Sequence, residues 1–142
     1  MKRVLLFGIL LIAFSLRVLY LDKFPVGFHA DEASSGYDAY SILKTGRDQW
    51  GNLMPLVLKS FGDYKSPLYS YLTVPSIAIF GLNKFAVRLP NAVIGTMAVL
   101  ALWLLVGEML KKKNIALVAA FLLAVSPWHI MMSRGAFEAN LI

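Results

Sequence analysis

Two apolar runs separated by four polar residues constrain this chain more than any other feature. Residues 89–110 and 115–130 are mostly apolar, and three lysines and an asparagine stand between them. An α-helix rises about 1.5 Å per residue, so runs of this length approach or exceed a hydrocarbon core of about 30 Å. The pattern predicts a helical hairpin in a membrane, with a basic turn between its two helices.

The composition agrees with a membrane protein. Of the 142 residues, 58% are hydrophobic and 15% are charged, and the mean hydropathy is +0.66. A soluble domain has about 45–50% apolar and about 25% charged residues. The chain has no cysteine, which excludes disulfide frameworks, thiolate zinc sites and thiol nucleophiles.

A third apolar run, residues 4–21, follows Lys2 and Arg3 and is interrupted by Arg17. A cleaved signal peptide has a similar basic start and apolar stretch, but no small-x-small cleavage site follows this run. We therefore predict an uncleaved membrane span. Arg17 is near its outer end, from which a long side chain can reach the interface.

The distribution of charge predicts the orientation. The net charge is +6, yet residues 22–87 contain as many acids as bases, so the excess lies mostly at the N-terminus and at residues 111–113. Basic clusters beside spans mark the cytoplasmic side. Residues 22–87 should then form one long extracytoplasmic loop. Nucleic-acid binding is excluded, because it requires a basic face on a soluble module.

Residues 33–45 of this loop have a helical pattern. Apolar residues recur there at spacings of three and four, Asp31 can serve as the N-cap, and Gly46 can end the helix. We expect this helix to lie on the membrane surface with its aromatic face down. Residues 46–62 are rich in turn residues and are interpreted as a loop.

Residues 67–82 are apolar enough to be considered a further span. The segment is short, contains Pro75 and ends near Gly81, and we interpret it as a juxtamembrane or re-entrant helix. A spanning helix is the alternative, and it would reverse the side of everything that follows.

The predicted fold class is therefore an all-α polytopic membrane protein. Three transmembrane helices (4–21, 89–110 and 115–130) are joined by an outer loop (22–87) with helices at 33–45 and 67–82, and residues 131–142 begin a second outer loop. We expect the chain to be the N-terminal part of a longer membrane protein, multi-pass in the plasma membrane with its N-terminus in the cytoplasm.

The adjacent carboxylates Asp31 and Glu32 are the strongest candidates for chemistry. A carboxylate at a membrane surface can act as a general base toward an acceptor hydroxyl or amine. The alternative is an N-cap followed by a first-turn acid, both favoured by the helix dipole. On these two residues alone the capping explanation is the stronger.

Basic residues on the same outer face could hold an anion. Lys65 suits a lipid phosphate as a point charge, although an interfacial lysine that only anchors the chain is the simpler explanation. Arg88 is interpreted as an interface anchor. The predicted topology also returns Arg134 and Glu138 to the face that carries Asp31.

Two histidines, His29 and His129, are too few for a metal site. His29 could help Asp31 and Glu32 to hold a divalent ion, but hydrogen bonding within the loop is the simpler explanation. The sequence has no glycine-rich phosphate loop, no Gly-x-Ser-x-Gly motif and no His-Glu-x-x-His motif.

The order of short motifs carries a resemblance to a known family. The motifs are Phe24-Pro25-x-Gly27, Asp31-Glu32, Lys65-Ser66-Pro67-Leu68, Phe85-Ala86-x-Arg88-Leu89-Pro90, and Ser133-Arg134 near Glu138. This order resembles the N-terminal part of the polyprenyl-phosphate-dependent glycosyltransferases with the C-type membrane fold. That group includes protein O-mannosyltransferases and lipid A aminoarabinose transferases. The resemblance covers essentially the whole chain.

The resemblance implies an enzyme and assigns roles to residues. A sugar carried on a polyprenyl phosphate would be transferred to a protein, lipid or glycan acceptor at the extracytoplasmic face, beside membrane lipid. Asp31 maps onto the family's catalytic aspartate, with Glu32 as its companion. Lys65 maps onto the lysine of the family's Lys-Pro-Pro, a phosphate contact, and Ser66 replaces one of the prolines. No cofactor is required by this assignment, which leaves a divalent metal open.

Three further residues are candidates for substrate binding. Glu138 takes the place of the family's second-loop acid. Arg134 and Tyr37 complete the set, the latter on the tyrosine-rich helix that follows the acidic pair.

The chemistry is consistent with this assignment. The reaction inverts the anomeric carbon as lipid phosphate leaves, so the leaving group needs charge neutralisation by Lys or Arg. The acceptor needs a carboxylate that removes its proton. The alternative function is a non-enzymatic membrane subunit or a transporter fragment. A transporter should show polar breaks within its spans, and residues 89–110 and 115–130 show none.

Overall fold

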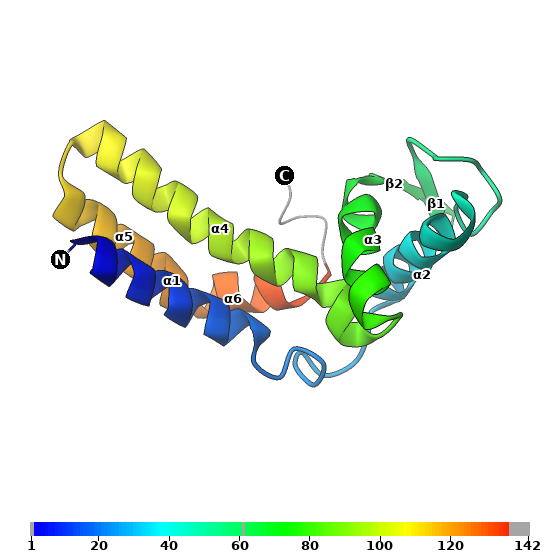
Figure 1. Cartoon of the computed structure of the whole chain (residues 1–142), viewed down its shortest axis with the longest axis horizontal. Helices are drawn as coiled ribbons and strands as arrows, with labels where there is room; N and C mark the ends of the chain where they lie inside the picture. The colour runs from blue at the N-terminus through cyan, green and yellow to red at the C-terminus, as the bar shows by residue number, and fades with distance from the viewer. Residues whose placement is uncertain (1, 61, 137–142) are drawn as a thin grey trace.

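The computed structural model describes residues 2–60 and 62–136. In this part of the chain, six helices and one two-stranded hairpin follow one another (Figure 1). They are α1 (Lys2–Val18), α2 (Ala30–Thr45), β1 (Leu58–Ser60), β2 (Asp63–Lys65), α3 (Leu68–Phe80), α4 (Lys84–Leu110), α5 (Lys113–Val125) and α6 (Pro127–Arg134).

The molecule is elongated, with a helical bundle at one end and a smaller layer at the other. Helices α1, α4 and α5 pack along one another, and α6 continues from α5 toward α3 (Figure 1). Helix α3 packs across the beginning of α4, and α2 with the hairpin lies beyond it. The turn between α4 and α5 and the start of α1 are therefore at the end of the molecule opposite α2.

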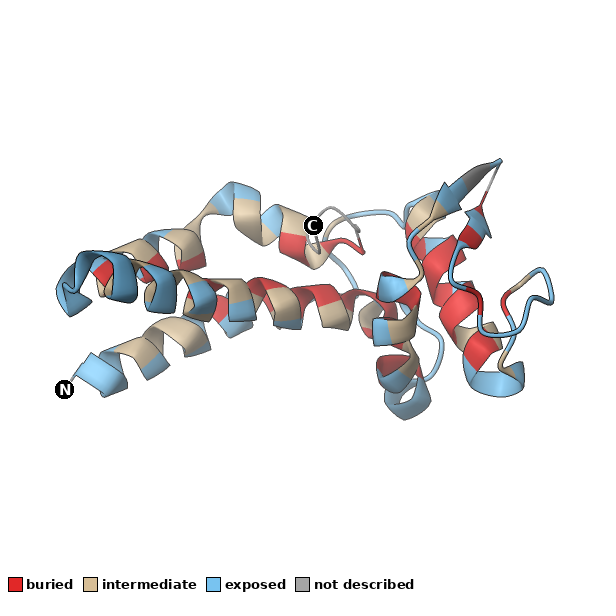
Figure 2. Ribbon diagram, turned by 90° about the horizontal axis from the view of Figure 1, so that it is seen from above, coloured by how far each residue is buried: buried red, intermediate tan, exposed pale blue. Residues whose placement is uncertain are grey.

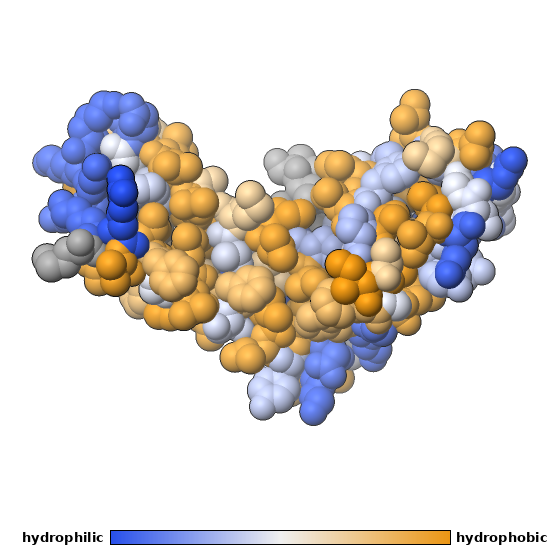
Figure 3. All heavy atoms as spheres, in the orientation of Figure 1, coloured by the Kyte–Doolittle hydropathy of each residue, from blue (hydrophilic) through white to orange (hydrophobic). Residues whose placement is uncertain are grey.

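The bundle is held together by small side chains and is apolar on its outside. Ala13, Val99, Ala120 and Ala124 form its buried core, whereas many large side chains, such as Phe7 with 69% of its surface exposed, point outward. Figure 3 shows this apolar surface between hydrophilic ends. A soluble monomer rarely exposes so continuous an apolar surface, so the bundle is suited to a lipid environment.

Among the described residues, α4 alone is a single helix long and apolar enough to cross a membrane. Helices α5 and α6 pass the same criterion together, but they are bent by 57° at their junction. Helix α1 has only 17 residues and contains three basic side chains. The structure therefore has one candidate span, or two if the bent pair is counted, and the first of the three predicted spans stays a prediction.

The single helix predicted over residues 115–130 is wrong, because the chain breaks at Ser126. Pro127 occupies the first turn of α6, where a missing backbone N–H costs nothing and where the ring prevents α5 from continuing. The break leaves the last carbonyls of α5 without helical partners.

Arg17 supplies those partners. We had expected this side chain to reach the membrane interface, and that expectation is wrong. Its side chain is fully buried. The guanidinium donates to the carbonyl oxygens of Ala13 at 2.8 Å and Ala124 at 3.1 Å, and it lies 2.7 Å from Nδ1 of His129. Burial is possible because the α5–α6 break offers acceptors inside the bundle.

Helix α2 begins three residues before the predicted start. Its N-cap is His29 and not Asp31: the ring Nδ1 of His29 accepts from the N–H of Asp31, while Glu32 accepts from the N–H of His29. This capping box satisfies two N–H groups at the helix start. Gly46 ends the helix in a left-handed conformation, as predicted.

The buried face of α2 is polar and small, opposite to its aromatic face. Ser34, Ser35, Gly36 and Asp38 are buried, and Figure 2 shows that buried residues concentrate along this helix and one side of α4. Tyr37 is 52% exposed. Tyr40 is partly buried against the core that contains Ala39 and Tyr69, so of these two tyrosines Tyr37 is the one free to contact a membrane surface, and that contact stays a prediction.

The β-hairpin corrects the all-α fold class to a mostly helical one. Strands β1 and β2 pair antiparallel, with Leu58 opposite Lys65, in a region that we had interpreted partly as a loop. Strands of three residues are too short to show a periodic pattern in the sequence. The hairpin determines where Lys65 lies.

Helix α3 has 13 residues and is too short to cross a bilayer, because it is only about 20 Å long. It packs against both α2 and α4. The juxtamembrane position, in which both ends of α3 lie on the outer side, stays a prediction.

Cysteine labelling tests this topology, and the natural absence of cysteine makes it direct. We expect an impermeant maleimide to label Leu56→Cys and Leu82→Cys in intact cells, since both side chains are exposed before and after α3. Asn114→Cys should react only after permeabilisation. Protection of Leu82→Cys together with labelling of Leu56→Cys would instead indicate that α3 spans the membrane.

Candidate active site

Asp31 and Lys65 meet at the end of the molecule opposite the basic turn. Asp31 is in the first turn of α2 and Lys65 ends β2. The Nζ atom of Lys65 lies 2.5 Å from Oδ1 of Asp31. The Asp31 side chain is 49% exposed, whereas that of Lys65 is 14% exposed. The fold thus joins the two residues for which the sequence suggested a base and a phosphate contact.

The carboxylate of Asp31 is held in its ionised form. Lys65 lowers the pKa of Asp31 by hydrogen bonding and by its charge, partial burial opposes this, and His29 lowers the pKa further. Nδ1 of His29 lies 3.2 Å from Oδ2 of Asp31. A half-exposed carboxylate that is ionised and fixed in position can accept a proton from a bound hydroxyl.

Glu32 points the other way and forms a buried ion pair with Arg88. Nε of Arg88 donates to Oε1 and Nη2 to Oε2, each at 2.9 Å, and the two side chains are 3% and 1% exposed. The N–H of Ala136 adds a bond of 2.8 Å to Oε1. Burial raises the pKa of Glu32, but the bonds from Arg88, Ala136 and His29 outweigh it and the pKa is lowered.

Arg88 also binds the loop that enters α2. Its remaining N–H groups donate to the carbonyl oxygens of Leu21, Pro25 and Gly27, at 3.2, 3.1 and 2.7 Å. The expectation that Arg88 is an interface anchor is therefore wrong, because the side chain is buried at the centre of this layer. Through Glu32 it sets the first turn of α2, which makes both of them positioning residues for Asp31.

The other predicted site residues are in other parts of the structure, and one of them lies outside the described residues. Arg134 donates to the carbonyl oxygens of Leu16, Leu19, Tyr20 and Phe24 and so holds the turn after α1. A substrate contact of Arg134 would compete with these bonds. Tyr37 is exposed on α2, with its ring centroid 6.5 Å from that of Tyr40. Glu138 lies outside the described residues.

The sequence analysis missed the polar contacts that dock the hairpin and the loop before it on α2. Asp38 is buried and accepts from the backbone N–H and the side-chain amide of Gln49, at 3.1 and 3.3 Å. The hydroxyl of Ser60 donates to that of Ser34 at 3.0 Å. Burial raises the pKa of Asp38, an effect that Lys65 partly opposes. The run of small polar residues in α2 was the available signal, since such residues permit close packing.

Within residues 2–60 and 62–136, no group of three or more His, Asp or Glu side chains could hold a metal ion.

A comparison with models of protein families identifies the family of this chain. The family model of the dolichyl-phosphate-mannose-protein mannosyltransferases matches residues 64–142, which is more than half of the sequence. The chain belongs to this family. The predicted resemblance to glycosyltransferases of this kind is thereby confirmed, and membership of a family of membrane proteins agrees with the apolar helix α4.

The matched region includes only part of the candidate site. It begins at the hairpin and includes Lys65, Arg88 and Arg134, whereas Asp31 and Glu32 precede it. The role of Asp31 therefore rests on its place beside Lys65. No curated protein and no solved structure matches the chain.

Proposed function

We propose that this chain carries the catalytic base and the phosphate contact of a glycosyltransferase that uses a polyprenyl-phosphate-linked sugar at the extracytoplasmic face. The ion pair between Asp31 and Lys65 carries the proposal. The family is described by a dolichyl-phosphate-mannose donor and a protein acceptor, which favours mannose as the sugar and a protein hydroxyl as the acceptor.

The reaction that suits this pair is a single displacement. The acceptor oxygen forms a bond to the anomeric carbon as the bond from that carbon to the phosphate oxygen breaks, so the configuration inverts. The acceptor proton goes to the carboxylate of Asp31. The leaving lipid phosphate keeps its electron pair, and the ammonium group of Lys65 stabilises the negative charge.

The contact between the two residues couples donor binding to base strength. A donor phosphate that attracts Lys65 would draw it from Asp31 and so remove the strongest influence that lowers the pKa of that carboxyl. The pKa of Asp31 would then rise toward its ordinary value. The carboxylate of Asp31 becomes a stronger base when the donor is bound, so proton removal from the acceptor is favoured at the stage when transfer can follow.

An apolar groove between α3 and α4 suits the lipid tail of the donor. Helix α3 begins three residues after Lys65, and together with α4 it forms a cavity of about 390 Å³. Its walls include Leu72, Pro75, Ile79 and Val93. Isoprenoid units would bury apolar surface there, at about 25 cal/mol per Å².

Substitution of Lys65 tests the donor contact. In the full-length protein, Lys65→Ala should weaken binding of a polyprenyl-phosphate sugar by roughly 1.5–3 kcal/mol, because one charged hydrogen bond is lost. Lys65→Arg should retain part of the affinity, since the charge stays while its geometry changes. Equilibrium binding of a labelled donor measures both.

Lys59→Ala is the matched control, since Lys59 is on the neighbouring strand and its Nζ lies 5.3 Å from the ring centroid of Trp50. Its donor affinity should be unchanged. Equal losses in the two variants would indicate a general charge effect, and unchanged affinity in Lys65→Ala would leave Lys65 as an anchor only.

Transfer itself separates the enzyme from the alternative of a non-enzymatic subunit. Purified full-length protein should convert a polyprenyl-phosphate mannose and an acceptor peptide into mannosylated peptide of inverted configuration, detected by mass spectrometry and NMR. Binding of the donor without any turnover would favour the subunit.

A further inference from the structure

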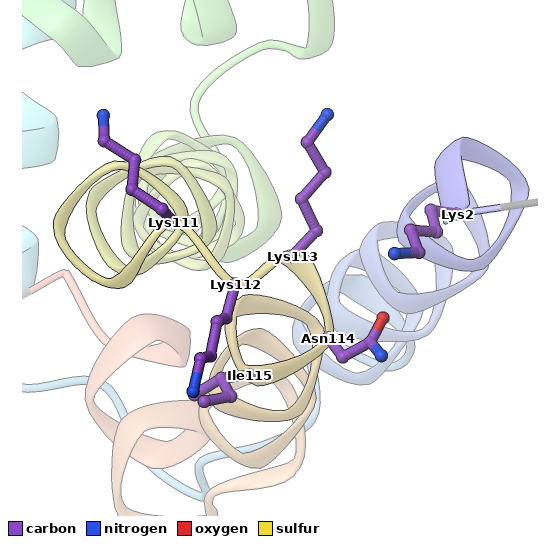
Figure 4. A pocket seen from close by; sticks show the side chains of 6 residues that line it. All are labelled: Lys2, Lys111, Lys112, Lys113, Asn114 and Ile115. Carbon is purple, nitrogen blue, oxygen red and sulfur yellow. The ribbon is translucent and has the colours of Figure 1, made fainter.

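The end of the bundle opposite Asp31 carries a cluster of cations around a cavity. Lys2 at the start of α1 and residues 111–115, which form the α4–α5 turn and the first turn of α5, surround a hollow of about 490 Å³. Figure 4 shows Lys113 between Lys111 and Lys2, with Lys112 directed to the opposite side. Two segments that are distant in the sequence thus converge on one basic site, which is outside the glycosyltransferase machinery.

The charge of this cluster is largely uncompensated. In the described part of the chain, Glu108 is the acid that forms an ion pair with the cluster, and its partner is Lys111. The remaining lysines are exposed at the polar end of an apolar surface. The side-chain amide of Asn114 also lines the cavity and adds a neutral donor. Such a set of donors is suited to an anion that carries several acceptor oxygens.

The apolar surroundings indicate what kind of anion would be present. Met109 and Leu110 precede the lysines and are 72% and 50% exposed, and Ile115 follows them and is 43% exposed. A ligand with an anionic head and apolar chains would satisfy the lysines and cover these side chains at once. Basic pockets between membrane helices bind anionic lipid head groups in this way.

We infer that the cavity lined by Lys2, Lys113 and Asn114 is a binding site for the phosphate head group of an anionic membrane lipid. The lipid holds α1 against the α4–α5 turn, since its phosphate is shared by both segments. This site is independent of sugar transfer, so its test needs no activity measurement.

Native mass spectrometry of the full-length protein in detergent, with added phosphatidylglycerol, tests the inference. Wild type should retain phosphatidylglycerol in preference to phosphatidylcholine. The double variant Lys2→Gln/Lys113→Gln should bind phosphatidylglycerol roughly 30-fold more weakly, which is about 2 kcal/mol for two cations. Glu108→Gln should strengthen binding, because it releases Lys111 from its ion pair.

The matched control removes two other lysines of the same charge. Lys23 and Lys44 are exposed and lie over the rings of Tyr20 and Tyr40, so Lys23→Gln/Lys44→Gln should bind phosphatidylglycerol as wild type does. Equal weakening in both double variants would overturn the site in favour of general charge attraction. Full displacement of the lipid by millimolar inorganic phosphate would overturn it in favour of a free-anion site.

Discussion

Replacing Asp31 with asparagine should reduce sugar transfer by the full-length protein about 10²–10⁴-fold. Asparagine keeps the shape of the side chain and can still accept a hydrogen bond from Lys65, but it cannot take the acceptor's proton. Folding should survive, because the N-cap of α2 is His29 and the Asp31 side chain is half exposed. Donor binding should not weaken and should tighten slightly, because loss of the ion pair releases Lys65 for the phosphate.

The measurement is the initial rate of mannose transfer from a saturating lipid-linked donor, together with donor affinity. Asp22→Asn is the matched control, since Asp22 is an exposed acid in the loop between α1 and α2, and its transfer rate should equal that of wild type. A near-normal rate in Asp31→Asn would remove this residue from the mechanism. A rate and a donor affinity that fall together would indicate a binding role.

Replacing Arg88 with methionine should destabilise the protein by about 3–5 kcal/mol, because Glu32 would be left as a buried, unpaired charge. The change also removes bonds to three carbonyl groups of the loop between α1 and α2. Thermal unfolding in detergent measures the loss. Lys84→Met is the control, four residues earlier on α4 and exposed, and its melting temperature should be near that of wild type.

The double variant Glu32→Gln/Arg88→Met decides whether the pair acts as a unit. If it does, the double variant should be more stable than Arg88→Met alone, since no buried charge remains. Additive losses in the cycle would contradict direct coupling.

The pH dependence of stability follows from the pKa of Glu32, which is lowered in the fold. Its stabilisation is present above the ordinary glutamate pKa and is lost as the pH falls through the folded value.

This geometry also separates the expected effects of replacing the two acids. The sequence suggested a companion role for Glu32 beside Asp31. In the structure the side chain of Glu32 is 3% exposed and paired with Arg88. Glu32→Gln should therefore act mainly on the stability of the fold. Asp31→Asn should act mainly on the transfer rate.

The sequence by itself predicted most of the helices, the basic turn and the two residues of the proposed site. Apolar content predicted α4 and the start of α5, and helical spacing with a glycine stop predicted most of α2. Such features depend on interactions between residues close in the sequence and on the solvent. Asp31 and Lys65 could be found as residue types, but nothing in the sequence showed that they touch.

Only the tertiary structure decided the partners of the buried charges. Arg88 and Glu32 are 56 residues apart, and Arg17 reaches carbonyl groups of α5 that become available at the Ser126 break. An arginine at the end of an apolar run has the same local pattern whether it points to the interface or into the bundle. Which of these occurs depends on whether docked segments supply enough acceptors to replace its water, and that is a property of the packed fold.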